Sequence, residues 1–249
     1  MAINSLYSHK SIRNYTSEPV NPETLNRIIA AGIRGSNTGN MQLYSIVLTQ
    51  DADMKAKLLP AHFGQPMVTS AAVVVTVCAD INRIGKWCEQ RNADAGFDNM
   101  QTLLWATIDA TIVTQNIALA AEEEGLGVCY LGTTTYNPDQ IIEILHLPKG
   151  VFPLTTLTIG HPASDMPLTD RLPVDAVVHH EMYADYSQGD IDRFYAAKES
   201  DPANQAFVSE NHKDNLAQVF SEVRYPRQAN EEFSRKVLEV LRSQGMLKE

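Results

Sequence analysis

The stretch LLWATIDATIVTQNIALAA, residues 103–121, decides the fold class of this chain. It is long enough to cross a membrane, but it contains Asp109 and leads into three glutamates, Glu122 to Glu124, which are costly inside a bilayer. Its apolar residues fall on most faces of a helix, which is typical of a helix buried inside a larger protein. The stretch therefore predicts a soluble protein built around one long buried helix.

Shorter elements surround this helix in the sequence. NPETLNRIIAAGIRG, residues 21–35, predicts a helix with Asn21 as N-cap, Pro22 in the first turn and Gly35 at its end. β-Branched runs at residues 43–49 and 71–79 predict two strands, and the second is apolar on both faces, as a central strand is. A short strand at 127–132, a helix capped by Asn137 and a strand at 152–162 follow.

The C-terminal part has a different character. From about Glu181 the apolar runs give way to polar helical patterns such as NHKDNLAQVFSEVR. No repeat or low-complexity linker separates the two parts. We therefore predict an α+β protein with a core over residues 1–180 and a helical excursion over 181–249, packed on the core or on a partner subunit.

Composition excludes several classes of function. The 249 residues carry a net charge of −10, which disfavours nonspecific binding to nucleic acid or to an anionic membrane. The three cysteines, Cys78, Cys88 and Cys129, form no metal-type pair and predict reduced, mostly buried thiols. The N-terminus has no apolar signal-peptide core, so we expect a cytoplasmic protein.

Familiar site motifs are absent or incomplete. EEGLGVCYLG has Tyr130 at the sixth position of the dinucleotide fingerprint and leads from a helix into a strand, the reverse of the usual order. His179 and His180 are adjacent and point apart on any regular element, so we predict no metal site. Cys129 has no base nearby in the sequence and favours a core thiol.

Four scattered stretches could bind an anionic, flat ligand. They are SHKSIRNY (8–15), with clustered positive charge, GSNTGNMQLY (35–44), rich in small polar residues, YLGTTT (130–135) and TDRLP (169–173). Each alone has an ordinary interpretation as surface charge, loop, turn or rim arginine.

Together these stretches resemble the FMN-dependent nitroreductase/flavin reductase family, most closely the branch of oxygen-insensitive NADPH nitroreductases and NADPH–FMN oxidoreductases. The resemblance spans about residues 5–183 in the right order, and includes EEEGLGVCYLG and LPKGVFPLTTLTIGHPASDMPLTDRLPVDAVVHHEMY. It implies a nitroreductase-like fold with a central, mainly antiparallel sheet flanked by helices. It also implies a homodimer with noncovalent FMN at the interface and the long helix in the dimer core.

The resemblance implies a role for each matching residue. His9 and Arg171 would hold the FMN phosphate, with Lys10 near it, because charged donors suit phosphate oxygens. Ser11 would contact ribityl or phosphate oxygens, and Arg13 would stabilise the reduced flavin at its N1/O2 edge. Gln65 would bond the pyrimidine edge, and Tyr130, Leu131 and Gly132 would line the ring. Four residues would come from the other subunit: Asn37, Thr38, Asn40 and Gln42.

The implied reaction has two half-reactions through one pocket. NADPH or NADH gives a hydride to the flavin and leaves, and an electron-poor nitroaromatic, quinone or free flavin then takes two electrons. Three departures matter: Thr169 stands where the branch usually has a lysine, asparagines replace hydroxyls in SNTGN, and the excursion offers only Lys198 and Lys213 to a 2′-phosphate. NADH use is therefore open. So are reductive dehalogenation or flavin fragmentation on the same scaffold, and a nonenzymatic flavin-binding protein.

Overall fold

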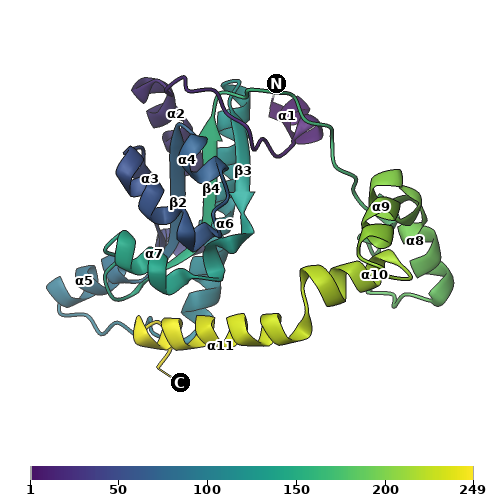
Figure 1. Ribbon diagram of the computed structural model, residues 1–249. Coiled ribbons are helices and arrows are strands. Elements are labelled where there is room, and N and C mark those ends of the chain that lie inside the picture. Colours follow the sequence, from purple (N-terminus) through teal and green to yellow (C-terminus); the bar gives the residue numbers. More distant parts are fainter. Residues whose placement is uncertain (1, 249) are drawn as a thin grey trace. The chain divides into compact units, whose positions relative to one another are not determined.

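The computed structural model describes residues 2–248 and contains one four-stranded antiparallel sheet in the order β1-β2-β4-β3 (Figure 1). The strands are β1 (Tyr44–Thr49), β2 (Val73–Asp80), β3 (Gly127–Leu131) and β4 (Val151–Gly160). All three pairings are antiparallel, and β2 is buried at every position. The predicted strands, the antiparallel sheet and the central place of β2 are confirmed.

Helices make up most of the remaining chain. They are α1 (Ala2–Ser8), α2 (Pro22–Gly32), α3 (Ala52–Leu58), α4 (Met67–Ser70), α5 (Asn82–Gln90), α6 (Met100–Glu123), α7 (Pro138–Ile144), α8 (Gln188–Ser200), α9 (Pro202–Glu210), α10 (Leu216–Gln218) and α11 (Arg227–Ser243). Single turns are η1 (Thr38–Asn40), η2 (Pro60–His62), η3 (Gly132–Thr135), η4 (Val174–Ala176) and the π-helical η5 (Val219–Arg224).

The sheet lies between two helical layers because successive side chains of β2 point to opposite faces. Val73, Val75 and Val77 pack with residues of α2 and α6 in one fully buried cluster. Val74 belongs to a second cluster, with residues of α3, α4 and α7. The fold is therefore a helix–sheet–helix sandwich, and α6 lies along one face of the sheet.

Helix α6 is buried on one face only. Ala106, Ala110 and Val113 are fully buried, whereas Met100, Leu104 and Ile108 are each about half exposed at 51%, 50% and 53%. These three lie four residues apart, on one side of the helix. The helix is long and apolar enough to cross a membrane, but its buried face belongs to the protein core. The prediction of a buried helix is confirmed for that face and wrong for the exposed stripe within the described chain.

Two predicted helix ends differ from the structure. Helix α2 begins as predicted, with the Asn21 side chain accepting from the Glu23 N–H, but it ends at Gly32 rather than Gly35. Gly35 is needed for packing instead, because a Cβ there would lie 2.9 Å from Ile112 Cγ2. Asn137 precedes α7 as predicted but makes no side-chain cap; its amide donates to the Ala61 carbonyl oxygen at 3.1 Å.

The chain divides into two compact units. The first comprises Met1–Pro167 and Arg235–Glu249 and contains the sheet; the second comprises Leu168–Ser234. The division thus comes earlier than the expected 180/181, and the C-terminal residues belong to the first unit. The assignment of the excursion to the outside of the core or to a partner subunit stays a prediction.

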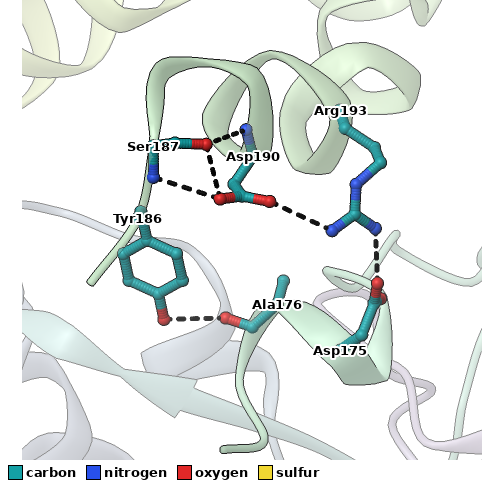
Figure 2. A network of polar contacts seen from close by, with 6 residues as sticks. All are labelled: Asp175, Ala176, Tyr186, Ser187, Asp190 and Arg193. Carbon is teal, nitrogen blue, oxygen red and sulfur yellow. Dashed lines mark hydrogen bonds and ion pairs between the residues drawn. The ribbon is translucent and has the colours of Figure 1, made fainter. Parts of the chain in front are cut away.

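Polar contacts order the second unit. Ser187 and Asp190 form a reciprocal capping box at the start of α8, and Arg193 bridges Asp190 and Asp175 (Figure 2). The Tyr186 hydroxyl donates to the Ala176 carbonyl oxygen at 2.9 Å. These contacts tie η4 to Tyr186 and to the first turns of α8, which orders this part of the second unit.

Candidate functional site

The N-terminal motif lies along the edge strand β3. Ser11 forms a bridge with Val128, and the Ile12 N–H donates to the Val128 carbonyl oxygen at 2.8 Å. The Tyr15 hydroxyl lies 2.7 Å from the Ile12 carbonyl oxygen and 2.8 Å from Thr158 Oγ1. Burial raises the pKa of the Tyr15 hydroxyl, so it stays protonated and can donate. The motif is thereby fixed on the sheet.

Glycines of EEGLGVCYLG allow this close approach. Gly125 ends α6 with φ of +78°, a left-handed value that favours glycine. A Cβ at Gly127 would lie 2.6 Å from Ile12 Cβ, closer than side chains can pack. These glycines thus allow the N-terminal motif SHKSIRNY to contact β3. This packing role accounts for the glycine pattern without a dinucleotide fingerprint.

The three basic residues of the motif have different surroundings. Nδ1 of His9 lies 2.7 Å from Glu122 Oε1, and Lys10 pairs with Asp165. Arg13 is exposed and makes no hydrogen bond or ion pair with any residue that the structure describes. It lies near Cys129: burial raises the pKa of this thiol, and the Arg13 charge opposes the rise. One free cation therefore lies beside β3.

A second segment meets the end of β3 through His62. The His62 ring is fully buried, and its Nδ1 lies 2.9 Å from Thr133 Oγ1 in η3. Burial lowers the pKa of His62 to about 4, so the ring is neutral at pH 7. Because the Gln65 N–H donates to the His62 carbonyl oxygen, this contact places Gln65 and Gly132 on neighbouring turns.

The turn at Gly132 is open above its backbone. Gly132 is exposed, and a Cβ there would meet no atom within 4 Å. Leu131 beside it is buried, and the Tyr130 hydroxyl donates to Gln115 Oε1 of α6 at 3.2 Å. Tyr130 therefore turns its hydroxyl toward α6, and among these three residues Gly132 has the exposed backbone.

The loop of small polar residues is held by a buried carboxylate. Asp109 of α6 has no exposed surface and accepts the Thr38 N–H at 2.8 Å and the Leu43 N–H at 3.1 Å. Between these contacts the chain takes three left-handed φ values, at Gly39, Asn40 and Gln42. The loop that carries the four residues expected from a partner subunit is thus anchored at both ends.

His9 and the loop over residues 37–42 are not brought together within the described first unit. His9 is held at Glu122 and the loop at Asp109, two points about 20 Å apart along α6 at 1.5 Å per residue. Arg171 belongs to the second unit, where its guanidinium donates to Thr169 Oγ1 at 2.8 Å and to the Asp170 carbonyl oxygen at 2.9 Å. Thr169, the residue in the usual lysine position, thereby holds the arginine side chain.

The described residues fit FMN in several respects. Arg13 offers an unpaired cation, and the Gly132 backbone is accessible. In the loop, Asn37 Oδ1 is buried without a hydrogen-bond partner, as expected of an acceptor placed for a ligand donor. Among residues 2–248 no cluster of His, Cys, Asp or Glu could hold a metal ion, and the three cysteines are free, with Cys88 partly exposed.

Sequence reasoning missed three residues that shape this site: Asp109, Glu122 and His62. Asp109 and Glu122 were visible as acids in or after an apolar helix, which is a signal of a buried acid in need of partners. His62 gave no local signal, because its partner Thr133 is distant in the sequence.

Comparison with known proteins agrees with this geometry. Residues 6–161 match the model of the Nitroreductase family. The chain is 39% identical over 184 residues to FMN reductase [NAD(P)H] of Bacillus subtilis, covering 73% of this chain and 74% of the relative. A solved structure from Bacteroides fragilis shares 48% identity with a TM-score of 0.97, covering 98% and 100% of the two chains.

A third similar protein has a bound nicotinamide nucleotide. NADPH:FMN oxidoreductase from Vibrio harveyi, solved in complex with NAD+, is 28% identical with a TM-score of 0.84, covering 98% of this chain and 97% of the other. The recognised order of motifs, the antiparallel sheet and these matches agree. The chain belongs to the nitroreductase family.

Proposed function

We propose that this protein is an FMN-dependent oxidoreductase that uses NADPH or NADH to reduce nitroaromatics, quinones or free flavins. Family membership and the names of the relatives, FMN reductase and NADPH:FMN oxidoreductase, support this class. The observation that carries the proposal is Arg13: an exposed guanidinium near Cys129 of β3, without a partner among the described residues. Strand β3 leads directly into the open backbone at Gly132.

Bound FMN would supply the redox chemistry, accepting a hydride from the nicotinamide and passing two electrons to the acceptor. The protein's part is binding and electrostatics. His9, Lys10, Ser11 and Arg171 would hold the phosphate and ribityl end, and Gln65 with residues 130–132 would hold the ring. Arg13 would place positive charge where the reduced ring carries negative charge, which lowers the cost of reduction. The reaction needs no further acid–base pair in the protein. An open pocket in which flat molecules can stack on the flavin ring suits a broad range of acceptors.

A homodimer would complete the site. The loop over residues 37–42 is anchored about 20 Å along α6 from His9, so the two groups would meet through a second copy. The exposed stripe Met100, Leu104 and Ile108 gives α6 an apolar face that a partner would cover. Replacing Ile108 with Lys should therefore yield monomers in sedimentation and weaken FMN binding. Gln90→Lys, at an exposed position in α5, is the control for an added surface charge away from this stripe. A dimer that survives Ile108→Lys with FMN bound would refute this arrangement.

The second unit favours NADH over NADPH as hydride donor. Its two lysines are paired with acids, Lys198 with Asp170 at 2.8 Å and Lys213 with Glu222 at 2.8 Å. Residues 168–234 contain more than twice as many acidic as basic residues, so a 2′-phosphate would be repelled there.

The test is stopped-flow reduction of the flavin-loaded protein by each nicotinamide, followed by oxidation with nitrofurazone, menadione or FMN. We expect reduction to be faster with NADH, and to slow in Arg13→Ala more than in Arg13→Lys. Protein that does not take up FMN would refute the proposal. Halide release from halogenated phenols, or fragmentation of reduced FMN in air, would indicate the dehalogenase or flavin-fragmenting alternative. Flavin binding without NAD(P)H turnover would indicate an electron-delivery protein.

We place the protein in the cytoplasm, in agreement with its expected reduced thiols.

A further inference from the structure

The carboxylate of Glu122 occupies an unusual position. It lies in the last turn of α6, its side chain is 13% exposed, and Oε1 is 2.7 Å from Nδ1 of His9. The backbone N–H of Lys10 also favours the charged form of this carboxylate. Its other oxygen, Oε2, is buried and has no hydrogen-bond partner among the described residues. A buried acid of this kind needs a positive charge beside it, and the His9 ring is the nearest group that can supply one.

We propose that Glu122 is a positioning residue that holds a proton on Nδ1 of His9, so that the ring can donate to an anion only from Nε2 and only as the cationic imidazolium. With Nδ1–H engaged by the carboxylate, a neutral ring would present the lone pair of Nε2 outward and repel a phosphate. Binding an anion at Nε2 therefore requires the second proton and brings a full positive charge with it. This inference rests on the proposed FMN function for the identity of the anion.

The surroundings of the pair favour this state. The last turn of α6 is the negative end of the helix dipole, which stabilises a nearby cation. Burial raises the pKa of the Glu122 carboxyl, and the hydrogen bonds from His9 and Lys10 oppose that rise. The His9 ring and the Lys10 N–H thus oppose the cost of burying this carboxylate.

Other charged groups near the pair are already engaged. Lys10 pairs with Asp165 on the segment after β4, and Glu123 of α6 accepts from Ser5 of α1. On β3, Tyr130 is the titratable group that senses Glu122, and burial with this acid raises the pKa of its hydroxyl. Glu122 is therefore the acid that acts on the His9 ring directly.

The chain provides closely matched controls. Glu122, Glu123 and Glu124 are consecutive at the same end of α6, so replacing any one with Gln removes the same charge from the same place. Glu124 pairs with Arg27 at 2.9 Å, and Glu123 contacts Ser5. A general effect of negative charge at the helix end would appear in all three variants, whereas the proposed pair predicts an effect of Glu122→Gln alone.

The first measurement needs no flavin. Ring nitrogens of 15N-histidine-labelled protein are followed by NMR against pH, with the His9 signals assigned from a His9→Asn variant. In the wild type and in Glu124→Gln we expect Nδ1 to carry the proton in the neutral ring, and the ring to become cationic at the same pH in both. In Glu122→Gln the cationic form should appear only at lower pH. An unchanged His9 titration in Glu122→Gln overturns the proposal, whether or not FMN binds.

The second measurement tests the link to the cofactor. FMN affinity is measured by quenching of flavin fluorescence between pH 7.0 and 8.5, where the phosphate is a dianion. In Glu122→Gln the affinity should begin to fall at lower pH than in the wild type, approaching tenfold per pH unit as the required proton becomes scarce. Glu123→Gln and Glu124→Gln should follow the wild type, and the difference should vanish when Glu122→Gln is combined with His9→Asn.

Each outcome decides a separate point. If the His9 titration shifts but the FMN profile does not, the phosphate is not bound through His9, and the proposed role of Glu122 in the cofactor site is wrong. If the wild type binds no FMN, the proposed function fails, while the NMR result still stands on the His9–Glu122 pair.

Discussion

Replacing Asp109 with Asn should destabilise the protein and release the loop over residues 37–42. The Asp109 carboxylate is fully buried and accepts two backbone N–H groups, from Thr38 at 2.8 Å and Leu43 at 3.1 Å. An Asn side chain has nearly the same shape but offers one acceptor oxygen and an NH2 group. One of the two N–H groups would then face a donor and remain unsatisfied inside the protein.

The magnitude follows from these two bonds. A hydrogen bond to a charged group contributes about 1.5–3 kcal/mol, and a buried donor left unsatisfied costs about 1–3 kcal/mol. Losing one bond and weakening the other should lower the free energy of unfolding by about 3 kcal/mol. For a chain of this length, that corresponds to a fall in Tm of roughly 6–12 °C.

Thermal unfolding of the FMN-free protein measures this effect without a contribution from ligand binding, and a fixed protomer concentration keeps any contribution of assembly comparable between variants. Asp53→Asn, at an exposed position in the first turn of α3, should change Tm little and serves as the control. FMN binding should also weaken in Asp109→Asn, because the loop supplies amides to the proposed site. A Tm within about 2 °C of the wild type would refute the reasoning, since the second N–H would then have found another partner.

Two further predictions concern stability. The folded-state pKa of His62 is about 4, below its value of 6.5 in the unfolded chain, so the unfolded state takes up the proton first as pH falls. Stability should therefore drop by about 3 kcal/mol between pH 6.5 and 4, and urea titrations of His62→Gln should lack this part of the decline. Gly127→Ala should lower stability by about 1–3 kcal/mol, because its Cβ would overlap Ile12; Gly85→Ala in α5, where the Cβ meets nothing within 4 Å, should be neutral or stabilising. Equal urea midpoints for the two glycine variants would contradict the close packing at Gly127.

The sequence predicted the elements whose causes are local. The β2 run is apolar on both faces and can only be a central strand, and the Asn21–Pro22 pair marks the start of α2 without help from the rest of the fold. The end of α2 could not be found in this way. Gly35 looks like a helix terminator, but its place is set by Ile112 of α6, which is distant in the sequence.

The exposed stripe of α6 shows a different limit. Met100, Leu104 and Ile108 contribute to the same apolar composition as the buried face, and composition alone cannot distinguish burial in one's own core from burial against a second copy. Only the packing of the described chain separates the two faces. The candidate site was likewise only partly predictable from the sequence. Its residues were matched by family resemblance, but the contacts that hold two of its parts come from Asp109 and Glu122, which belong to no recognisable motif.

Those acids give the long helix a second role. Asp109 and the glutamates after residue 121 were the reason to reject a membrane span, and two of them, Asp109 and Glu122, each hold a different part of the candidate site. A buried carboxylate is stable only when donors surround it, so a carboxylate placed on a core helix draws a loop or a ring toward that helix. Asp109 draws the loop that would serve the partner subunit, and Glu122 draws the His9 ring of its own chain. Because both lie on α6, whose free face would form the subunit contact, one α6 would position part of its own chain's FMN site and part of the partner's site.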